Sequence, residues 1–326
     1  MKLTSYARRE IGSSSIPNLV LTDQGYIGFS SPNDELEKAI NALQGQEATN
    51  DIANLPKVKA GTFLEPAILK LFHDELHFIC AEQGKLPLNI SVPDKAYFYE
   101  VDGGKIGSSL DAEMRLDTTL NLIDHSKSSH SLNGKGVIEI KNYSGAASDD
   151  VSEIYKLQVQ AQLLTTGYNY AILVRLVKGW ELQWFVYKPN KEIQDKLINA
   201  AVEFWHRVDG IMQGDKLHYA AANTKEASRI FKGNGSKDVI NFNKNNELPQ
   251  LIDDYLSADK AIKASKKIQD TVSIRIKEIL GEHEKAECQG YMINHSTYER
   301  AKTKTIKVEG AAPTITRRFT IKDMNG

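Results

Sequence analysis

The sequence lacks the features that define several common classes of protein. Cys80 and Cys288 are its only cysteines, so neither a disulfide scaffold nor a four-cysteine zinc or iron–sulfur site can be built from it. No apolar run approaches the roughly 20 residues that a membrane helix needs, and residues 1–12 carry charge but no apolar segment. We therefore expect no signal peptide, no membrane partner and a reducing, cytoplasmic location.

An excess of charge of one sign is also missing. Lys and Arg number 41 and Asp and Glu number 42, which gives a formal net charge of −1. A polyanionic partner would therefore be held by local basic patches and not by the overall charge. Hydrophobic residues make up 41% and charged residues 25%, an ordinary globular composition that excludes disorder over most of the chain.

The length of 326 residues predicts one large core with an appendage, or two domains. Residues 223–247 are polar, lack hydrophobic periodicity and are predicted to form a linker or loop. The residues before them, 1–222, form the predicted core. The residues after them, 248–326, are predicted to form a C-terminal extension with a helical hairpin within 248–287 and short strands at 290–295, 305–309 and 314–322.

Within the core, helical and extended patterns alternate. Helices are expected at residues 62–80, 151–166 and 190–212. Strands are expected at 86–92, 96–101, 105–116, 136–143, 168–177 and 180–188, the last two as a hairpin that turns at 178–179. Residues 124–136 are interpreted as an extended hairpin loop. This order predicts an α/β fold whose central, mixed β-sheet is flanked by helices.

The strongest chemical feature is Glu139-Ile140-Lys141, inside a predicted strand. Side chains alternate along a strand, so Glu139 and Lys141 project from one face. A carboxylate beside an ammonium group suits metal-assisted phosphodiester hydrolysis, in which the carboxylate binds Mg²⁺ and the amine orients or deprotonates water. Asp111, at the end of an upstream strand, offers a second carboxylate, and the carbonyl of Ile140 offers a further oxygen ligand.

An ordinary ion-pair face on a half-solvated sheet would explain the same triplet. Two observations favour the functional interpretation. No other Asp/Glu-x-Lys triplet occurs among the 42 acidic residues. The triplet also lies beside Val137 and Ile138, in a run apolar enough for a central strand, where charges are costly unless they bind something.

Asp111 followed by Glu139-x-Lys141 resembles the PD-(D/E)xK nuclease core. Further segments occur in the order seen in the lambda-exonuclease/YqaJ-like viral recombinase family, from about residue 8 to about residue 188: Arg8-Arg9-Glu10-Ile11-Gly12-Ser13-Ser14, Gly61-Thr-Phe-Leu-Glu65, Gly107-Ser-Ser-Leu-Asp111, Val137-Ile-Glu139-Ile-Lys141 and Tyr155-Lys-Leu-Gln158. The resemblance implies a restriction-endonuclease-like core with an N-terminal segment that binds the 5′ end of DNA.

The resemblance also assigns roles to single residues. Asp111 and Glu139 would bind one or two Mg²⁺ ions, with Mn²⁺ as a substitute, and Lys141 would be the catalytic lysine. Glu65 would assist the metal site, and Gln158 would help position Lys141, water or phosphate. The 5′-terminal phosphate would be bound by Arg8, Ser13 and Ser14, although the neighbouring Arg9 leaves the choice of arginine open.

The activity implied is a Mg²⁺-dependent 5′→3′ exonuclease that digests linear double-stranded DNA with a 5′-phosphorylated end. Such enzymes leave 3′ single strands for phage-type recombination in a bacterial or phage-infected cytoplasm. Many members form a trimeric ring, so a homo-oligomer is expected, together with a single-strand annealing protein as a partner. This sequence departs from the family at Asn142-Tyr143, where a small residue and Pro are common, which puts the following loop in doubt.

Several alternatives stay open. The same site would serve a RecB-like or restriction-type endonuclease or a repair nuclease, and the fold would also suit a non-catalytic module that binds DNA ends. Glu65 would equally complete a capping box with Thr62, with Pro66 in the first helical turn. Gln158 is chosen over Gln160, and Gln162 alternates with them on the same predicted helix.

Overall fold

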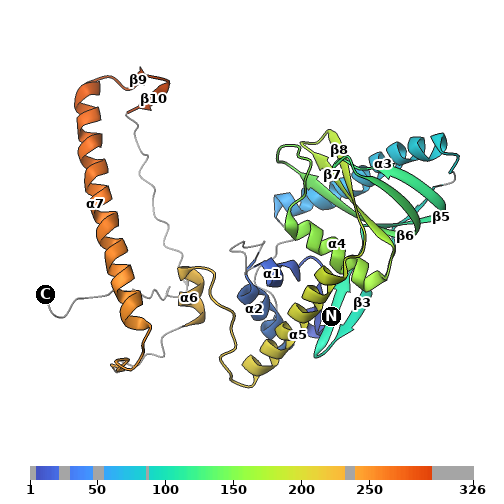
Figure 1. Cartoon of the computed structure of the whole chain (residues 1–326), viewed down its shortest axis with the longest axis horizontal. Coiled ribbons are helices and arrows are strands. Elements are labelled where there is room, and N and C mark those ends of the chain that lie inside the picture. Colours follow the sequence, from blue (N-terminus) through green and yellow to red (C-terminus); the bar gives the residue numbers. More distant parts are fainter. Residues whose placement is uncertain (1–4, 22–29, 47–54, 86–87, 232–238, 296–326) are drawn as a thin grey trace, which may run out of the picture. The chain divides into compact units, whose positions relative to one another are not determined.

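The computed structural model describes residues 5–21, 30–46, 55–85, 88–231 and 239–295 (Figure 1). It consists of two compact units, residues 1–230 and residues 231–326. The first unit contains the whole predicted core. Helix α6 (Thr224–Ile230) ends this unit and lies within residues 223–247, which the sequence pattern predicted as a linker.

A five-stranded sheet forms the centre of the first unit. Its strand order is β2 (Asn89–Ser91), β5 (Ala112–Ile123), β6 (Ser129–Tyr143), β7 (Tyr170–Val177) and β8 (Glu181–Tyr187). Strands β6 and β7 pair in parallel and the other neighbours are antiparallel. The sheet is therefore mixed and flanked by helices, which confirms the predicted fold class. The hairpin of β7 and β8 also turns at the expected residues, 178–179.

Helices cover both faces of this sheet. Helix α3 (Pro56–Glu82) packs through Ile68 and Phe72 against one set of alternating strand residues. Helix α4 (Glu153–Thr166) packs through Val159 and Leu163 against the other set. Every residue of β7 is consequently buried, as is typical of a strand covered on both faces. This strand pairs with β6, on which Glu139 and Ile140 are buried as well.

A smaller sheet lies next to the first. Strand β1 (Glu10–Gly12) pairs in parallel with β4 (Gly104–Ser108), which pairs antiparallel with β3 (Tyr97–Val101). A second apolar core joins this region to helices α1 (Pro17–Val20), α2 (Pro32–Leu43) and α5 (Lys191–Met212). Residues 105–116 were predicted as one strand, but they form parts of two strands in different sheets, with the chain changing direction at residues 109–111.

The turn that joins β5 to β6 is shorter than predicted. Strand pairing continues to Ile123 and Ser129, so the predicted loop at 124–136 was wrong for most of its length. Asp124 holds the turn because its carboxylate accepts hydrogen bonds from the amides of Ser126 (2.9 Å), Ser128 (3.1 Å) and Val186 (3.2 Å). Polar composition was misleading here because the two strands have one solvated face.

The start of α3 also differs from the prediction. The helix begins at Pro56, with Leu55 as its N-cap, and Pro66 lies in its interior. Thr62 donates its hydroxyl hydrogen to the carbonyl of Val58, 3.2 Å away and four residues earlier, as an interior helical threonine does. The proposed capping box of Thr62 and Glu65 was therefore wrong, and it no longer explains why Glu65 is there.

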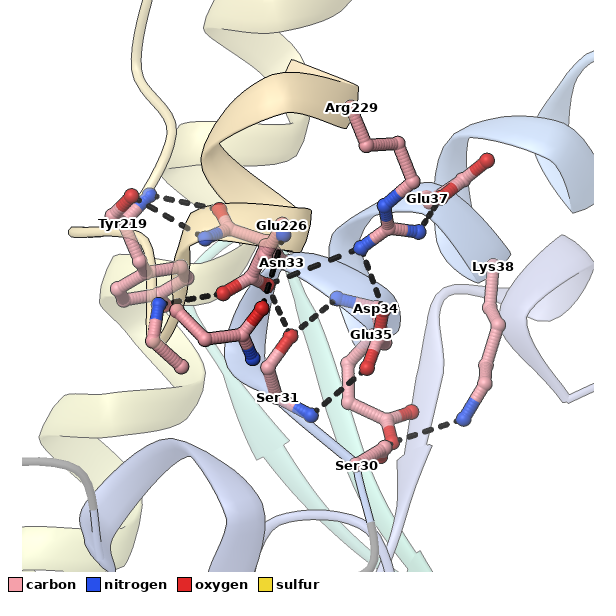
Figure 2. A network of polar contacts seen from close by, with 12 residues as sticks. Ser30, Ser31, Asn33, Asp34, Glu35, Glu37, Lys38, Tyr219, Glu226 and Arg229 are labelled. Atoms are coloured by element: carbon pink, nitrogen blue, oxygen red, sulfur yellow. Dashed lines mark hydrogen bonds and ion pairs between the residues drawn. The ribbon is translucent and has the colours of Figure 1, made fainter. Parts of the chain in front are cut away.

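A polar network attaches α6 to the N-terminus of α2 (Figure 2). Arg229 forms ion pairs with Asp34 and Glu37, while Glu226 accepts a hydrogen bond from the hydroxyl of Ser31. Ser31 and Asp34 also form a reciprocal capping box at the first turn of α2. These contacts join residues almost 200 positions apart in the sequence and hold the last helix of the first unit against α2.

The second unit holds one long helix, α7 (Leu248–Leu280), and a hairpin of β9 (Lys285–Cys288) and β10 (Tyr291–Asn294). The predicted helical hairpin within 248–287 was wrong, because the helix continues without a break. The strands predicted at 305–309 and 314–322 lie outside the described residues. In the described part of the chain, no helix combines the length and apolarity needed to cross a membrane.

Candidate active site

Strand pairing brings Asp111 next to Glu139. The β5–β6 ladder ends at the pair Ala112–Ile138. One residue beyond that end, the carboxylate of Asp111 accepts a hydrogen bond from the amide of Ile140, with 2.7 Å between Oδ2 and N. The two acidic residues therefore meet although a whole hairpin separates them in the sequence. Asp111 lies in the break between β4 and β5 and not at a strand end as predicted, which leaves its carboxylate clear of the ladder.

Glu139 is almost completely buried, with 2% of its surface exposed. Its Oε1 accepts hydrogen bonds from the ammonium group of Lys141 and from the side-chain amide of Gln158 at 2.6 Å. Its Oε2 accepts one from the side-chain amide of Gln162 at 2.5 Å. Three donors hold this carboxylate in one orientation, and one of them is a cation. Burial of this carboxylate is tolerable because each of these three contacts donates a hydrogen bond to it.

Helix α4 supplies both amides. Gln158 and Gln162 are one helical turn apart, so they share the face that packs on Glu139. Gln158 was the sequence-based choice and does contact Glu139. Gln162 was not chosen, although its spacing of four residues from Gln158 was a signal that could have identified it. Gln160 does not contact Glu139. Its side chain bonds the segment that connects β8 to α5, by donating to the carbonyl of Lys188 and accepting from the amide of Asn190.

Lys141 occupies the centre of the cluster. Burial alone would lower the pKa of its amine, but the adjacent Glu139 and the charge of Asp111 outweigh burial and raise the pKa above its usual value. The ammonium group also lies 5.1 Å from the centre of the Tyr155 ring, within the range of a cation–π contact. The amine is therefore held protonated and fixed in place.

The pKa values of Asp111 and Glu65 are raised as well, but for these two acids a raised pKa favours the neutral form. Burial, together with the charge of Glu139, raises the pKa of Asp111 to about 7. Glu65, on α3, is half-buried, and burial followed by the charge of Glu139 raises the pKa of this carboxyl as well. Three carboxylates and a single ammonium group thus share one small region, which leaves an excess of negative charge.

The donor set fits a hard divalent cation. Among the described residues, no group of three His, Cys, Asp or Glu side chains converges closely enough to hold a metal ion without other ligands. Mg²⁺ does not require such a group, because it usually binds to one or two carboxylates and keeps several waters or substrate phosphates. Asp111 and Glu139 supply two carboxylates, and the amide of Ile140, the residue after Glu139, is bonded to Asp111. The excess negative charge is of the kind that such an ion neutralises.

The N-terminal segment lies beside the strand that leads to Asp111. The amide of Ser13 donates a hydrogen bond to the carbonyl of Gly107 on β4, 2.7 Å away. Ser13 itself is buried, whereas Ser14 is exposed. Arg8 is exposed and forms an ion pair with Glu10 at 3.1 Å. The segment therefore presents a hydroxyl and a guanidinium group at the surface.

The two adjacent arginines have different surroundings. Arg9 forms a bidentate ion pair with Asp209, with N···O distances of 2.8 and 2.9 Å. Its guanidinium carbon also lies 5.0 Å from the centre of the Trp205 ring, and its backbone has a positive φ of 55°. Arg9 is thus engaged in joining the N-terminal segment to α5. Arg8 is the more exposed of the two and is paired with Glu10.

Comparison with known proteins finds distant structural similarity. LHK-Exo in complex with dAMP is 15% identical and aligns with 65% of this chain and 94% of its own, with a TM-score of 0.44. The alkaline exonuclease LHK-Exo from Laribacter hongkongensis is also 15% identical, over 64% and 94% of the two chains, with a TM-score of 0.43. A third structure, SSO0001, has a TM-score of 0.34 at 15% identity over 64% and 77%. No protein-family model and no curated protein matched the sequence.

Proposed function

We propose that this protein is a metal-dependent deoxyribonuclease that digests linear double-stranded DNA from its 5′ ends. The observation that carries the proposal is the buried Glu139, which is bonded to Lys141 and lies next to Asp111 from the neighbouring strand. A purely structural ion pair would not need a second carboxylate whose pKa burial and Glu139 raise to about 7. Two carboxylates and one amine are the side chains that metal-assisted phosphodiester hydrolysis uses.

In this proposal Asp111 and Glu139 hold Mg²⁺, with Mn²⁺ as a substitute and with room for a second ion. When bound, the ion polarises a phosphoryl oxygen and lowers the pKa of a bound water. The carbonyl of Ile140 is a further ligand, and Glu65 acts at the edge of the site. Gln158 and Gln162 keep the Glu139 carboxylate in a fixed orientation, so that no reorganisation is needed when substrate arrives.

Lys141 acts as a hydrogen-bond donor and as a positive charge. Its raised pKa means that the amine is protonated at neutral pH, so it orients the attacking water and stabilises the charge that develops on the phosphoryl oxygens. The water-orienting role is therefore preferred to that of a general base. A lysine with so many anionic neighbours does not release its proton readily.

The direction of digestion is proposed from the N-terminal segment and from the family resemblance. The exposed Arg8 and Ser14 provide a guanidinium group and a hydroxyl beside β4, and Ser13 belongs to the same turn. Arg groups and hydroxyls are common ligands of terminal phosphates. The 3′ single strands that remain would be substrates for an annealing partner in phage-type recombination, and a trimeric ring would keep the enzyme on its duplex.

A nuclease assay tests this proposal. The full chain with Mg²⁺ should release nucleotides from linear duplex DNA with 5′-phosphates, should be inactive with EDTA and should leave closed circles intact. Cleavage of closed circles would instead favour the endonuclease alternative. Failure to release any nucleotide with either Mg²⁺ or Mn²⁺, while DNA ends are still bound, would leave only a non-catalytic end-binding module.

The choice of end is tested with two variants and two substrates. Arg8→Ala and Ser14→Ala should each slow the digestion of 5′-phosphorylated ends far more than that of 5′-hydroxyl ends, because only the phosphate contact is lost. The 5′-hydroxyl substrate serves as the internal control for folding. Equal losses on both substrates would remove the N-terminal segment from end recognition.

A further inference from the structure

A cavity of about 280 Å³ with a mixed polar and apolar lining lies directly beside the proposed catalytic cluster of Asp111, Glu139 and Lys141. Lys141 forms part of its wall, and the rest comes from the end of β6, from β7, from the loop 144–152 and from the first turn of α4. The side chains that matter here are Tyr143, Ser148, Ser152, Tyr155 and Arg175. No residue of the metal-binding pair Asp111 and Glu139 lines it, so the cavity is a separate space that shares only Lys141 with the site.

Arg175 gives the cavity a buried positive charge. This residue lies on β7 directly opposite Lys141 on β6, and only 4% of its surface is exposed. Its guanidinium group donates to neutral oxygens, namely the side chain of Gln183 (2.8 Å) and the carbonyls of Asp150 (3.1 Å) and Ser148. Among the described residues, no carboxylate forms an ion pair with Arg175. The guanidinium carbon also lies 5.2 and 4.8 Å from the centres of the Tyr143 and Phe185 rings, which offsets part of the cost of burying the cation. None of these contacts neutralises its charge, so a ligand that supplies negative charge would be bound favourably.

The remaining charges and dipoles around the cavity favour an anion too. The one carboxylate in the wall belongs to Asp150, whose side chain is 79% exposed and paired with Lys156 at 2.9 Å. Lys141 is paired with Glu139, so Arg175 is the cation in the wall for which no ion pair is found among the described residues. Helix α4 begins at Glu153, immediately after Ser152, and its first turn adds the positive end of a helix dipole to the same wall.

We propose that this cavity binds a phosphate group of the nucleic-acid strand, adjacent to the phosphodiester at the catalytic cluster. This inference rests on the proposed nuclease function and names a subsite within it. The volume lies just below the 300–1,000 Å³ of typical small-ligand sites, so it accommodates a phosphate with its sugar and not a complete nucleotide. The hydroxyls of Ser148 and Ser152 and the two tyrosines supply polar and flat surfaces around that group.

Ser152→Asp tests the subsite with little risk to folding. Aspartate is as good an N-cap as serine, and an acid at the start of α4 suits the helix dipole, so the variant should fold normally. It nevertheless places a negative charge in the cavity wall. Ser144→Asp is the matched control, because Ser144 is an exposed serine of the same loop that does not line the cavity.

Binding is measured by titration calorimetry on the full chain in EDTA, with no cleavage possible. The probes are thymidine 5′-monophosphate, the 5′-phosphorylated thymidine dinucleotide, inorganic phosphate and thymidine. Wild type and Ser144→Asp should bind the two nucleotides equally well, whereas Ser152→Asp should bind them at least about tenfold more weakly. Thymidine, which lacks phosphate, should bind more weakly than either nucleotide by a similar factor.

The probes also separate the possible sources of the phosphate. Tighter binding of the dinucleotide assigns the subsite to the DNA strand, and equal binding of inorganic phosphate assigns it to a released terminal phosphate. Equal affinities in the two serine variants, or thymidine binding as tight as the nucleotides, would overturn the subsite. If the enzyme cleaves DNA and Ser152→Asp keeps the wild-type KM, the subsite fails alone. If nucleotides bind as expected but DNA is not cleaved, the nuclease proposal fails alone.

Discussion

The first unit contains two clusters of buried acidic residues, which differ in how many hydrogen-bond donors and cations surround each carboxylate. At the N-terminus of α2, Glu35 is 1% exposed, and its carboxylate accepts hydrogen bonds from Tyr6, Ser30, Asn18 (3.1 Å) and Lys38 (2.9 Å). Figure 2 also shows the polar contacts between α2 and α6, in which Arg229 pairs with Asp34 and Glu37. At the catalytic cluster Glu139 is equally well supplied with donors, but Asp111 accepts only one hydrogen bond among the contacts of the described residues.

The two clusters consequently shift carboxyl pKa values in opposite directions. For Asp34, in the α2 cluster, burial would raise the pKa, but the hydrogen bond to Ser31 and the charge of Arg229 lower it below its usual value. For Asp111, burial and the charge of Glu139 raise the pKa to about 7. A cluster that only stabilises the fold provides its acids with donors and cations. Asp111 has one hydrogen-bond donor among the described residues and a raised pKa, a perturbation of the kind that is common at functional sites.

The largest contrast is expected between two lysines. Lys141→Met should reduce the rate of DNA cleavage by ~10²-fold or more, because it removes the positioned donor and the charge at the reacting phosphate. Lys38→Met, in the α2 cluster, should leave the rate per folded molecule within about twofold, since that amine only supports Glu35. Initial rates on linear duplex and DNA affinity in EDTA are the measurements. Losing less than about tenfold in Lys141→Met would remove the catalytic role of this amine.

Glu35→Gln should lower the free energy of unfolding by about 3 kcal/mol, because donors that were bonded to a buried carboxylate would face an amide group. The cleavage rate of the folded fraction should not change. Urea denaturation followed by circular dichroism measures the loss. A change below about 0.5 kcal/mol would mean that the α2 cluster does not stabilise the fold in the way its contacts indicate.

Asp111→Asn should abolish cleavage and yet stabilise the metal-free protein at pH 8, by on the order of 1 kcal/mol or more. The folded-state pKa of Asp111, about 7, lies above the unfolded value of about 3.9. Its contribution to stability is therefore complete below about pH 4 and is lost as the pH rises through 7. Asparagine carries no charge at either pH, so the variant and wild type should have similar stability near pH 4. Thermal melts in EDTA at both pH values check the sign.

Asp34→Asn should give the smallest effect, with the opposite dependence on pH. The folded-state pKa of Asp34 is lowered, so its stabilisation is present above the unfolded value of about 3.9 and is lost as the pH falls through the folded value. The side chain is 37% exposed, so solvent screening limits the loss at pH 7 to less than about 1 kcal/mol. The same melts, extended to pH 3, should show the two stabilities converging on the acidic side. Convergence at alkaline pH instead would contradict this assignment.

Sequence patterns predicted the fold class better than the bounds of the single elements. The alternation of helical and extended patterns was enough to predict a mixed sheet, and the alternation of side chains along a strand put Glu139 and Lys141 on one face. The pairing that brings Asp111 to Ile140 depends on where the β5–β6 ladder ends, and no local pattern encodes that end. Gln162 was within reach of the sequence, since a spacing of four residues from Gln158 puts both on one side of a helix.

Other errors came from interpreting local patterns without their tertiary partners. Thr62 and Glu65 have the spacing of a capping box. However, α3 already begins at Pro56, six residues before Thr62, so both residues lie inside the helix. Residues 105–116 have the pattern of one strand but belong to two strands in different sheets. The alternation of apolar and polar residues does not indicate which neighbouring strand a segment pairs with. The contacts of α2 with α6 are single hydrogen bonds and ion pairs between residues far apart in the sequence, so they produce no hydrophobic periodicity from which they could be predicted.

The central claim is that Asp111 binds a metal ion, whereas Glu35 only stabilises the fold. Titration of Mg²⁺ into the full chain by calorimetry tests this claim most directly. Wild type and Glu35→Gln should bind one or two ions per chain with the same affinity, and Asp111→Asn should bind at least about tenfold more weakly. Equal affinities in wild type and Asp111→Asn would contradict the account, because the acid that accepts a single hydrogen bond from the described residues would then not be the one that binds the metal.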